Sequence, residues 1–135
     1  MSTDLANGTG TPGDLITSDS YLYYYRALVR KVYDGDTCTV DVDLGLKTWV
    51  MGETLRLLRI NAPEVRGEER PAGLLARDFL REQIDGKEVV IQTIKDSKGK
   101  YGRYLAEIWI QGEDGQWINI NDLMVQQGHA EYHEY

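Results

Sequence analysis

The stretch DGDTCTVDVDL, residues 34–44, decides the fold. Its opening pair, Asp34-Gly35, predicts a tight hairpin turn, because such a turn needs positive φ angles that glycine adopts without steric cost. From Asp36 to Leu44 polar and apolar residues alternate, which is the pattern of a half-buried strand. The preceding segment, Tyr21 to Tyr33, is rich in aromatic and β-branched residues and predicts the partner strand. The sheet therefore begins with an antiparallel hairpin.

Turn residues divide the rest of the chain into further strands and helices. The expected elements are a third strand from Lys47 to Ile60, bent near Gly52, a helix from Pro71 to Ile84, strands from Glu88 to Ile94, from Tyr104 to Ile110 and from Trp117 to Ile120, and a helix from Asp122 to Gln127 capped by Asn121. Three meandering strands, a helix and two closing strands are the order of a five-stranded Greek-key barrel. We therefore predict a mainly β (α+β) OB-fold, with a helix between its third and fourth strands and a short helix after its fifth.

The distribution of charge restricts where an anion could bind. The chain of 135 residues has a net charge of −7, which argues against broad nonspecific binding to duplex DNA. All 15 lysines and arginines lie between residues 21 and 103, so an anion-binding site is expected in that segment. Residues 1–20 are mostly small and polar and predict a disordered tail. The remaining residues, 21–135, have the length of one domain.

Several classes of protein are poorly supported. Cys38 is the only cysteine, which excludes an internal disulfide and a cysteine-rich zinc site. His129 and His133 both lie near the end of the chain, which disfavours catalysis built on a central histidine. No apolar run approaches the ~18 residues of a membrane span, and residues 1–20 lack the features of a secretory signal. We expect a monomer that makes no membrane contact and that is cytoplasmic, or secreted if a leader has been removed.

Charged residues in unusual places mark the candidate site. Asp36 either belongs only to the hairpin turn or offers a carboxylate to a metal ion. Arg56 interrupts an apolar strand, so it needs an anionic partner, which is Asp36, Glu64 or a phosphate group. Strand alternation places Arg59 on the opposite face. The sequence leaves open which arginine points into the site, and the other is expected in solvent. Asn61 and Glu64 flank the end of this strand, where functional side chains often lie.

A second basic segment follows the fourth predicted strand. It reads Lys98-Gly-Lys-Tyr-Gly-Arg103. Such a segment is often only a solvated loop. Alternatively, it delivers Arg103 to a bound anion.

Three of these segments together resemble one family. Asp34-Gly-Asp-Thr37, Arg56-Leu-Leu followed by Ile60-Asn-Ala-Pro-Glu64, and Lys100-Tyr-Gly-Arg103 occur in an order that is similar to the staphylococcal nuclease family. The resemblance covers residues 24–130. It implies an OB-fold and calcium-dependent cleavage of DNA and RNA that leaves 3′-phosphate and 5′-hydroxyl ends.

The resemblance also implies a role for each matching residue. The calcium ligands would be Asp36, Asn61 and the backbone carbonyl of Ala62. Glu64 would be the general base, and Arg56 and Arg103 would bind the phosphate. Lys100 and Tyr101 would approach the phosphate end of the substrate. Single-stranded or locally open DNA or RNA would be that substrate.

The chain also departs from the family pattern. Asn61 stands where an aspartate is usual, so calcium binding should be weaker because one negative charge is missing. Ala62 replaces the usual threonine, and the loop from Val65 to Arg70 is short. One alternative is therefore a noncatalytic OB-fold module that binds nucleic acid or a protein. Another is a sugar-binding OB-fold that uses Trp49 and Trp109, although both tryptophans fit core positions better.

Overall fold

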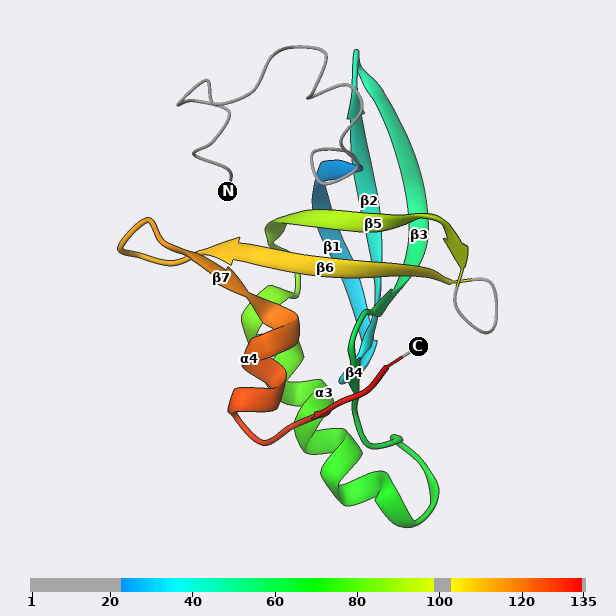
Figure 1. The fold of residues 1–135 in the computed structure, drawn as a ribbon, viewed down its shortest axis with the longest axis vertical. Helices are drawn as coiled ribbons and strands as arrows, with labels where there is room; N and C mark the ends of the chain where they lie inside the picture. The colour runs from blue at the N-terminus through cyan, green and yellow to red at the C-terminus, as the bar shows by residue number, and fades with distance from the viewer. Residues whose placement is uncertain (1–22, 99–102, 135) are drawn as a thin grey trace.

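Five strands close into a barrel in the computed structural model, which describes residues 23–98 and 103–134 (Figure 1). Strands β1 (Tyr24–Asp34), β2 (Thr37–Gly45) and β3 (Thr48–Leu57) form an antiparallel meander. Strand β5 (Glu88–Lys98) pairs with β1, and β6 (Tyr104–Gln111) pairs with β5. A parallel pairing of β3 with β6 closes the barrel. This topology is the predicted OB-fold.

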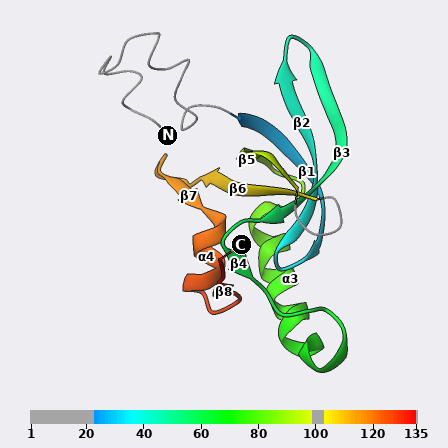
Figure 2. The same cartoon turned by 45° about the vertical axis from the view of Figure 1, so that its right-hand side comes forward.

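A bulge bends the β2–β3 hairpin where the sequence predicted it. Asp41 on β2 lies opposite an extra residue of β3, because the register shifts between Val40 and Val42. Gly52 takes up the bend with φ of +71°, an angle that costs glycine nothing. The backbone N of Gly52 donates a hydrogen bond of 2.9 Å to Asp41 Oδ1. The hairpin then projects beyond the barrel (Figure 2).

Two helices lie at one end of the barrel (Figure 1). A 3-10 turn (Gly67–Glu69) leads into α3 (Arg70–Ile84), which has Pro71 in its first turn. Helix α3 buries Ala76, Leu80 and Ile84 against the barrel. The shorter elements are β4 (Ile60–Asn61), β7 (Trp117–Asn119), α4 (Ile120–Gln126) and β8 (Glu131–Tyr132). Neither helix in the described part of the chain is long and apolar enough to cross a membrane.

The core fills the barrel between its wall and the helices. Its fully buried side chains come from every barrel strand and from both helices; they include Val29, Val40, Leu55, Leu57, Leu80, Ile91, Ile108 and Met124. Cys38 is also in this core, and burial raises the pKa of its thiol to about 12. The thiol is therefore unreactive in the folded protein at neutral pH.

Some local predictions were wrong. The N-cap of α4 is Asn119, whose side chain accepts a hydrogen bond of 2.9 Å from the backbone N of Asp122. Asn121 is instead fully buried. Trp49 was expected in the core but is 49% exposed on the β2–β3 hairpin. Trp109 is half-buried and contacts the ring of Tyr24 at 5.7 Å.

Other predictions concern the edges of the described chain. Strand β5 runs to Lys98, through residues that were predicted to begin a loop. The predicted tail of residues 1–20 lies outside the described residues, as do Lys100 and Tyr101.

Candidate active site

The Asp34-Gly35 turn brings β1 close to the segment after β4. The sequence argument for Gly35 was wrong, since its φ is not positive. A Cβ atom on Gly35 would instead lie 2.8 Å from the Cβ atoms of both Ala62 and Ala76. Glycine is therefore required because α3 and the Ala62 segment approach the turn too closely for a side chain. This close approach brings Asp36 next to Ala62.

Asp36 is a buried carboxylate that is held from several directions. Its side chain forms an ion pair of 3.2 Å with Arg56 Nη2. Its Oδ2 atom also accepts a hydrogen bond of 2.7 Å from the backbone N of Ala62. Its Oδ1 atom accepts one of 3.2 Å from Thr37 Oγ1. These contacts fix the orientation of the carboxylate before any ligand binds.

Arg56 joins Asp36 to β4. Its Nη1 atom donates to the carbonyls of Leu57 at 2.8 Å and Ile60 at 3.0 Å. Its Nη2 atom donates to Asn61 Oδ1 at 3.1 Å. The structure therefore selects Asp36, rather than Glu64, as the buried anionic partner of this arginine. One planar guanidinium thus orders two of the predicted calcium ligands, Asp36 and Asn61.

Arg103 reaches the same surface from the other side. Its Nη1 atom donates to Thr37 Oγ1 at 3.2 Å. Thr37 pairs with Arg56 across the β2–β3 ladder. Both predicted phosphate-binding arginines therefore lie beside the same threonine, although they are far apart in the sequence.

Glu64 lies in the loop after β4 and its side chain is exposed. No hydrogen bond or ion pair joins its carboxylate to the rest of the described chain. Its backbone, however, is tightly held by α3. A Cβ atom on Gly73 would lie 2.0 Å from the Glu64 carbonyl oxygen, so only glycine allows this contact. The sequence analysis missed Gly73, and a glycine inside a predicted helix was the signal that could have found it.

Arg59 was expected in solvent; its side chain is 41% exposed, but it also forms ion pairs that the sequence did not predict. Its Nε and Nη2 atoms donate to both carboxylate oxygens of Glu107, at 2.6 and 2.8 Å, and its Nη1 atom donates to Asp122 at 3.0 Å. These hydrogen bonds raise the pKa of Arg59, and the one to Glu107 has the largest effect. The backbone at Arg59 has φ of +71°, which is strained for a side chain with a Cβ atom. The ion pairs offset this strain.

The turn at Arg59 also anchors the C-terminal segment to β4. The carbonyl of Arg59 accepts a hydrogen bond of 2.7 Å from the backbone N of His133. Strand β8 pairs with β4, with Asn61 opposite Glu131. On the inner side, Asn121 Nδ2 donates to the carbonyl of Leu58 at 2.9 Å. The segment from Leu58 to Asn61 is therefore held from both sides.

The electrostatics of Asp36 favour a bound cation. Burial, and then the charge of Asp34, raise the pKa of Asp36 to about 7, and Arg56 only partly offsets this. A carboxylate with a raised pKa is costly to ionise, and a nearby cation removes that cost.

This raised pKa gives a pH prediction. Because the pKa of Asp36 is higher in the folded chain than in the unfolded chain, the group stabilises the fold below about pH 4. That contribution is lost as the pH rises to about 7. In EDTA, Asp36→Asn should therefore be less destabilising at pH 8 than at pH 4 when unfolding by urea is measured. The exposed variant Glu113→Gln is the control, and an effect of Asp36→Asn that is equal at both pH values would contradict the prediction.

The residues at this site fit a hard cation that is bound by oxygen atoms, few of which carry a negative charge. Carboxylate, amide and carbonyl oxygens from Asp36, Asn61 and Ala62 are the ligand atoms that calcium prefers. The described residues contain no group of three or more histidine, cysteine, aspartate or glutamate side chains that could hold a metal ion. Backbone carbonyl groups and water would therefore complete the coordination, and the affinity should be modest.

Comparison with known proteins gives related results. Residues 54–135 match the model of the family described as staphylococcal nuclease homologue. A thermonuclease of Staphylococcus intermedius is 32% identical over 89 residues, which cover 64% of this chain and 49% of that protein. A thermonuclease of Staphylococcus hyicus is 33% identical over 88 residues, which cover 63% and 48%. An uncharacterized protein of Methanocaldococcus jannaschii is 31% identical over 133 residues, which cover 83% and 60%. The chain thus spans between about half and three fifths of the length of these relatives.

Proposed function

Because the chain belongs to the staphylococcal nuclease homologue family, we propose that it is a calcium-dependent phosphodiesterase that cleaves DNA or RNA. The observation that carries the proposal is the network of Asp36, Arg56, Asn61 and Arg103. It joins hard oxygen ligands to two guanidinium groups on one surface of the barrel. That combination suits a phosphodiester, whose charge increases during attack. Single-stranded or locally open nucleic acid is the proposed substrate.

Each residue has a distinct part in the proposed reaction. Asp36, Asn61 and the carbonyl of Ala62 would hold calcium, which when bound lowers the energy of the charge on the phosphate oxygens. Arg56 and Arg103 would place positive charge beside the same oxygens. Glu64 would take a proton from the attacking water. The water oxygen would bond to phosphorus as the bond between phosphorus and the 5′-oxygen breaks. The leaving 5′-oxygen would take a proton from solvent, which gives 3′-phosphate and 5′-hydroxyl ends.

Cleavage of single-stranded DNA tests the proposal directly. We expect cleavage in millimolar calcium, none in EDTA, and a fall of about 10²-fold or more in Arg103→Ala, because a charge-stabilising donor is lost. Arg26→Ala is the matched control, since the Arg26 side chain is 73% exposed in an ion pair on the opposite part of β1. A folded protein that does not cleave DNA or RNA in calcium would instead favour the noncatalytic OB-fold module.

Asn61 determines how tightly calcium should bind. Asn61→Asp would place a second carboxylate beside Arg56 Nη2, where the amide oxygen now lies at 3.1 Å. We expect the calcium dissociation constant to fall about tenfold, because the affinity of a hard cation increases with ligand charge. Calorimetric titration measures this without any substrate. The control variant Gln111→Glu adds the same charge at an exposed site on β6 and should leave the calcium dissociation constant unchanged. If Asn61→Asp and the wild type bind calcium with equal affinity, Asn61 is not a ligand.

A further inference from the structure

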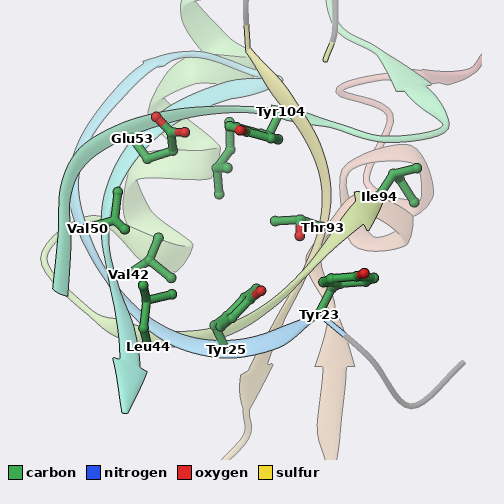
Figure 3. Close-up of a pocket in the computed structure, with 10 residues that line it drawn as sticks. Tyr23, Tyr25, Val42, Leu44, Val50, Glu53, Thr93, Ile94 and Tyr104 are labelled. Carbon is green, nitrogen blue, oxygen red and sulfur yellow. The ribbon is translucent and has the colours of Figure 1, made fainter. Parts of the chain in front are cut away.

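A pocket of about 330 Å³ opens at the mouth of the barrel and is not part of the candidate active site. Figure 3 looks into it, with α3 behind. Aliphatic side chains from the β2–β3 hairpin form one wall. Tyr25 comes from the start of β1 and Tyr23 directly precedes this strand, while Tyr104 comes from the start of β6. The volume is within the range of small-molecule sites.

Glu53 is the unusual member of this pocket. It precedes Leu55 by two positions on β3, so strand alternation turns both side chains toward the inside of the barrel. Within the described part of the chain, the Glu53 carboxylate has no ion pair or hydrogen bond. Among the described residues that line the pocket, it is the only ionisable side chain apart from the tyrosines. An acid in an apolar pocket favours a ligand that brings a positive charge.

The tyrosines favour the same kind of ligand. Figure 3 shows Tyr25 and Tyr104 projecting into the pocket from opposite sides, with Glu53 near Tyr104 and Tyr23 at the rim. The face of an aromatic ring carries negative potential and attracts cations, and rings around a cavity bind quaternary ammonium groups. Methyl groups on such a cation would contact the aliphatic wall. The net charge of −7 adds long-range attraction for cations.

We propose that this barrel-mouth pocket binds a quaternary ammonium group. The tyrosine rings surround its methyl groups, and Glu53 balances its charge. Leu55 lines the pocket, whereas the next residue, Arg56, lies in the candidate active site. The two sites therefore use opposite faces of β3. Binding at the pocket does not require the chain to be a nuclease.

Titration with choline, followed by nuclear magnetic resonance of the tyrosine ring signals, tests this proposal. We expect saturable binding with a dissociation constant on the order of 1 mM. The neutral compound 3,3-dimethylbutan-1-ol has nearly the same shape and should bind at least about tenfold more weakly, because it lacks the charge. Equal binding of the two compounds would show an apolar cavity without cation selectivity, and an absence of saturable binding by choline would reject the site.

Variants separate the contributions of the two kinds of side chain. Tyr25→Leu and Glu53→Gln should each weaken choline binding about five- to tenfold, whereas Tyr25→Phe should retain it because the ring remains. The control is Tyr33→Leu, since Tyr33 is exposed and does not line the pocket. Unchanged binding in both Tyr25→Leu and Glu53→Gln would place choline elsewhere. The quaternary ammonium group could belong to a protein side chain or to a free small molecule, and a peptide with trimethyl-lysine distinguishes the two. Tighter binding of the peptide than of choline indicates a protein side chain, and weaker binding indicates a free small molecule.

Discussion

Glu64→Gln is expected to keep the fold and to lose most hydrolysis. An exposed carboxylate without described contacts contributes little to stability, so the free energy of unfolding should change by less than about 0.5 kcal/mol. A glutamine side chain cannot accept the proton of the attacking water, and general base catalysis contributes about 10²- to 10⁴-fold. The fall should appear in kcat, since Glu64 is not proposed to hold the substrate. Initial rates over a range of single-stranded DNA concentrations measure it.

The matched control for this variant is Glu68→Gln. Glu68 is an exposed acid in the 3-10 turn that follows Glu64 in the same loop. It loses the same charge, so an equal fall in both variants would indicate a general electrostatic effect rather than a base. Full activity of Glu64→Gln would remove Glu64 from the proposed mechanism.

The barrel could be predicted because its signals are local. Alternation in residues 36–44 and the placement of Gly52 and Pro71 each act within a few residues, and the structure confirms the elements they predict. The grouping of Asp36 with Arg56 was also predictable in part. A charge inside an apolar strand must be paired, although periodicity left its partner open.

The remaining features depend on contacts between distant segments. Gly35 and Gly73 are required by close approach of other backbone and side-chain atoms, which no turn rule detects. The ion pairs of Arg59 could not be predicted, because β3 ends at Leu57 and the φ of +71° at Arg59 takes this residue out of the strand alternation. The carboxylates of Glu107 and Asp122 reach Arg59 from elements far along the chain. The role of Asn121 could not be predicted for the same reason, because its buried amide donates hydrogen bonds to the carbonyls of Leu58 and Ala106, which are distant in the sequence.

Arg56→Met should be the most destabilising of these substitutions. The side chains of Arg56 and Asp36 are only 10% and 8% exposed, and loss of the arginine leaves the carboxylate buried and uncompensated. Breaking a buried pair in this way costs about 3–5 kcal/mol. Urea unfolding at pH 8, above the pKa of about 7 of Asp36, measures the change. The control is Arg26→Met, which removes an ion pair with Glu88 whose side chains are 73% and 70% exposed and should cost less than about 1 kcal/mol.

A second substitution distinguishes the charge of Arg56 from its shape. Asp36→Asn combined with Arg56→Met should recover part of the lost stability, because it removes the uncompensated charge.

Arg56→Lys keeps the charge, but one ammonium group cannot reach Leu57, Ile60 and Asn61 together as the planar guanidinium does. We expect this variant to fold and to cleave about 10²-fold more slowly. Full activity of Arg56→Lys would mean that charge alone suffices. A cost below about 1 kcal/mol for Arg56→Met would mean that the Asp36 pair does not hold β4 in place.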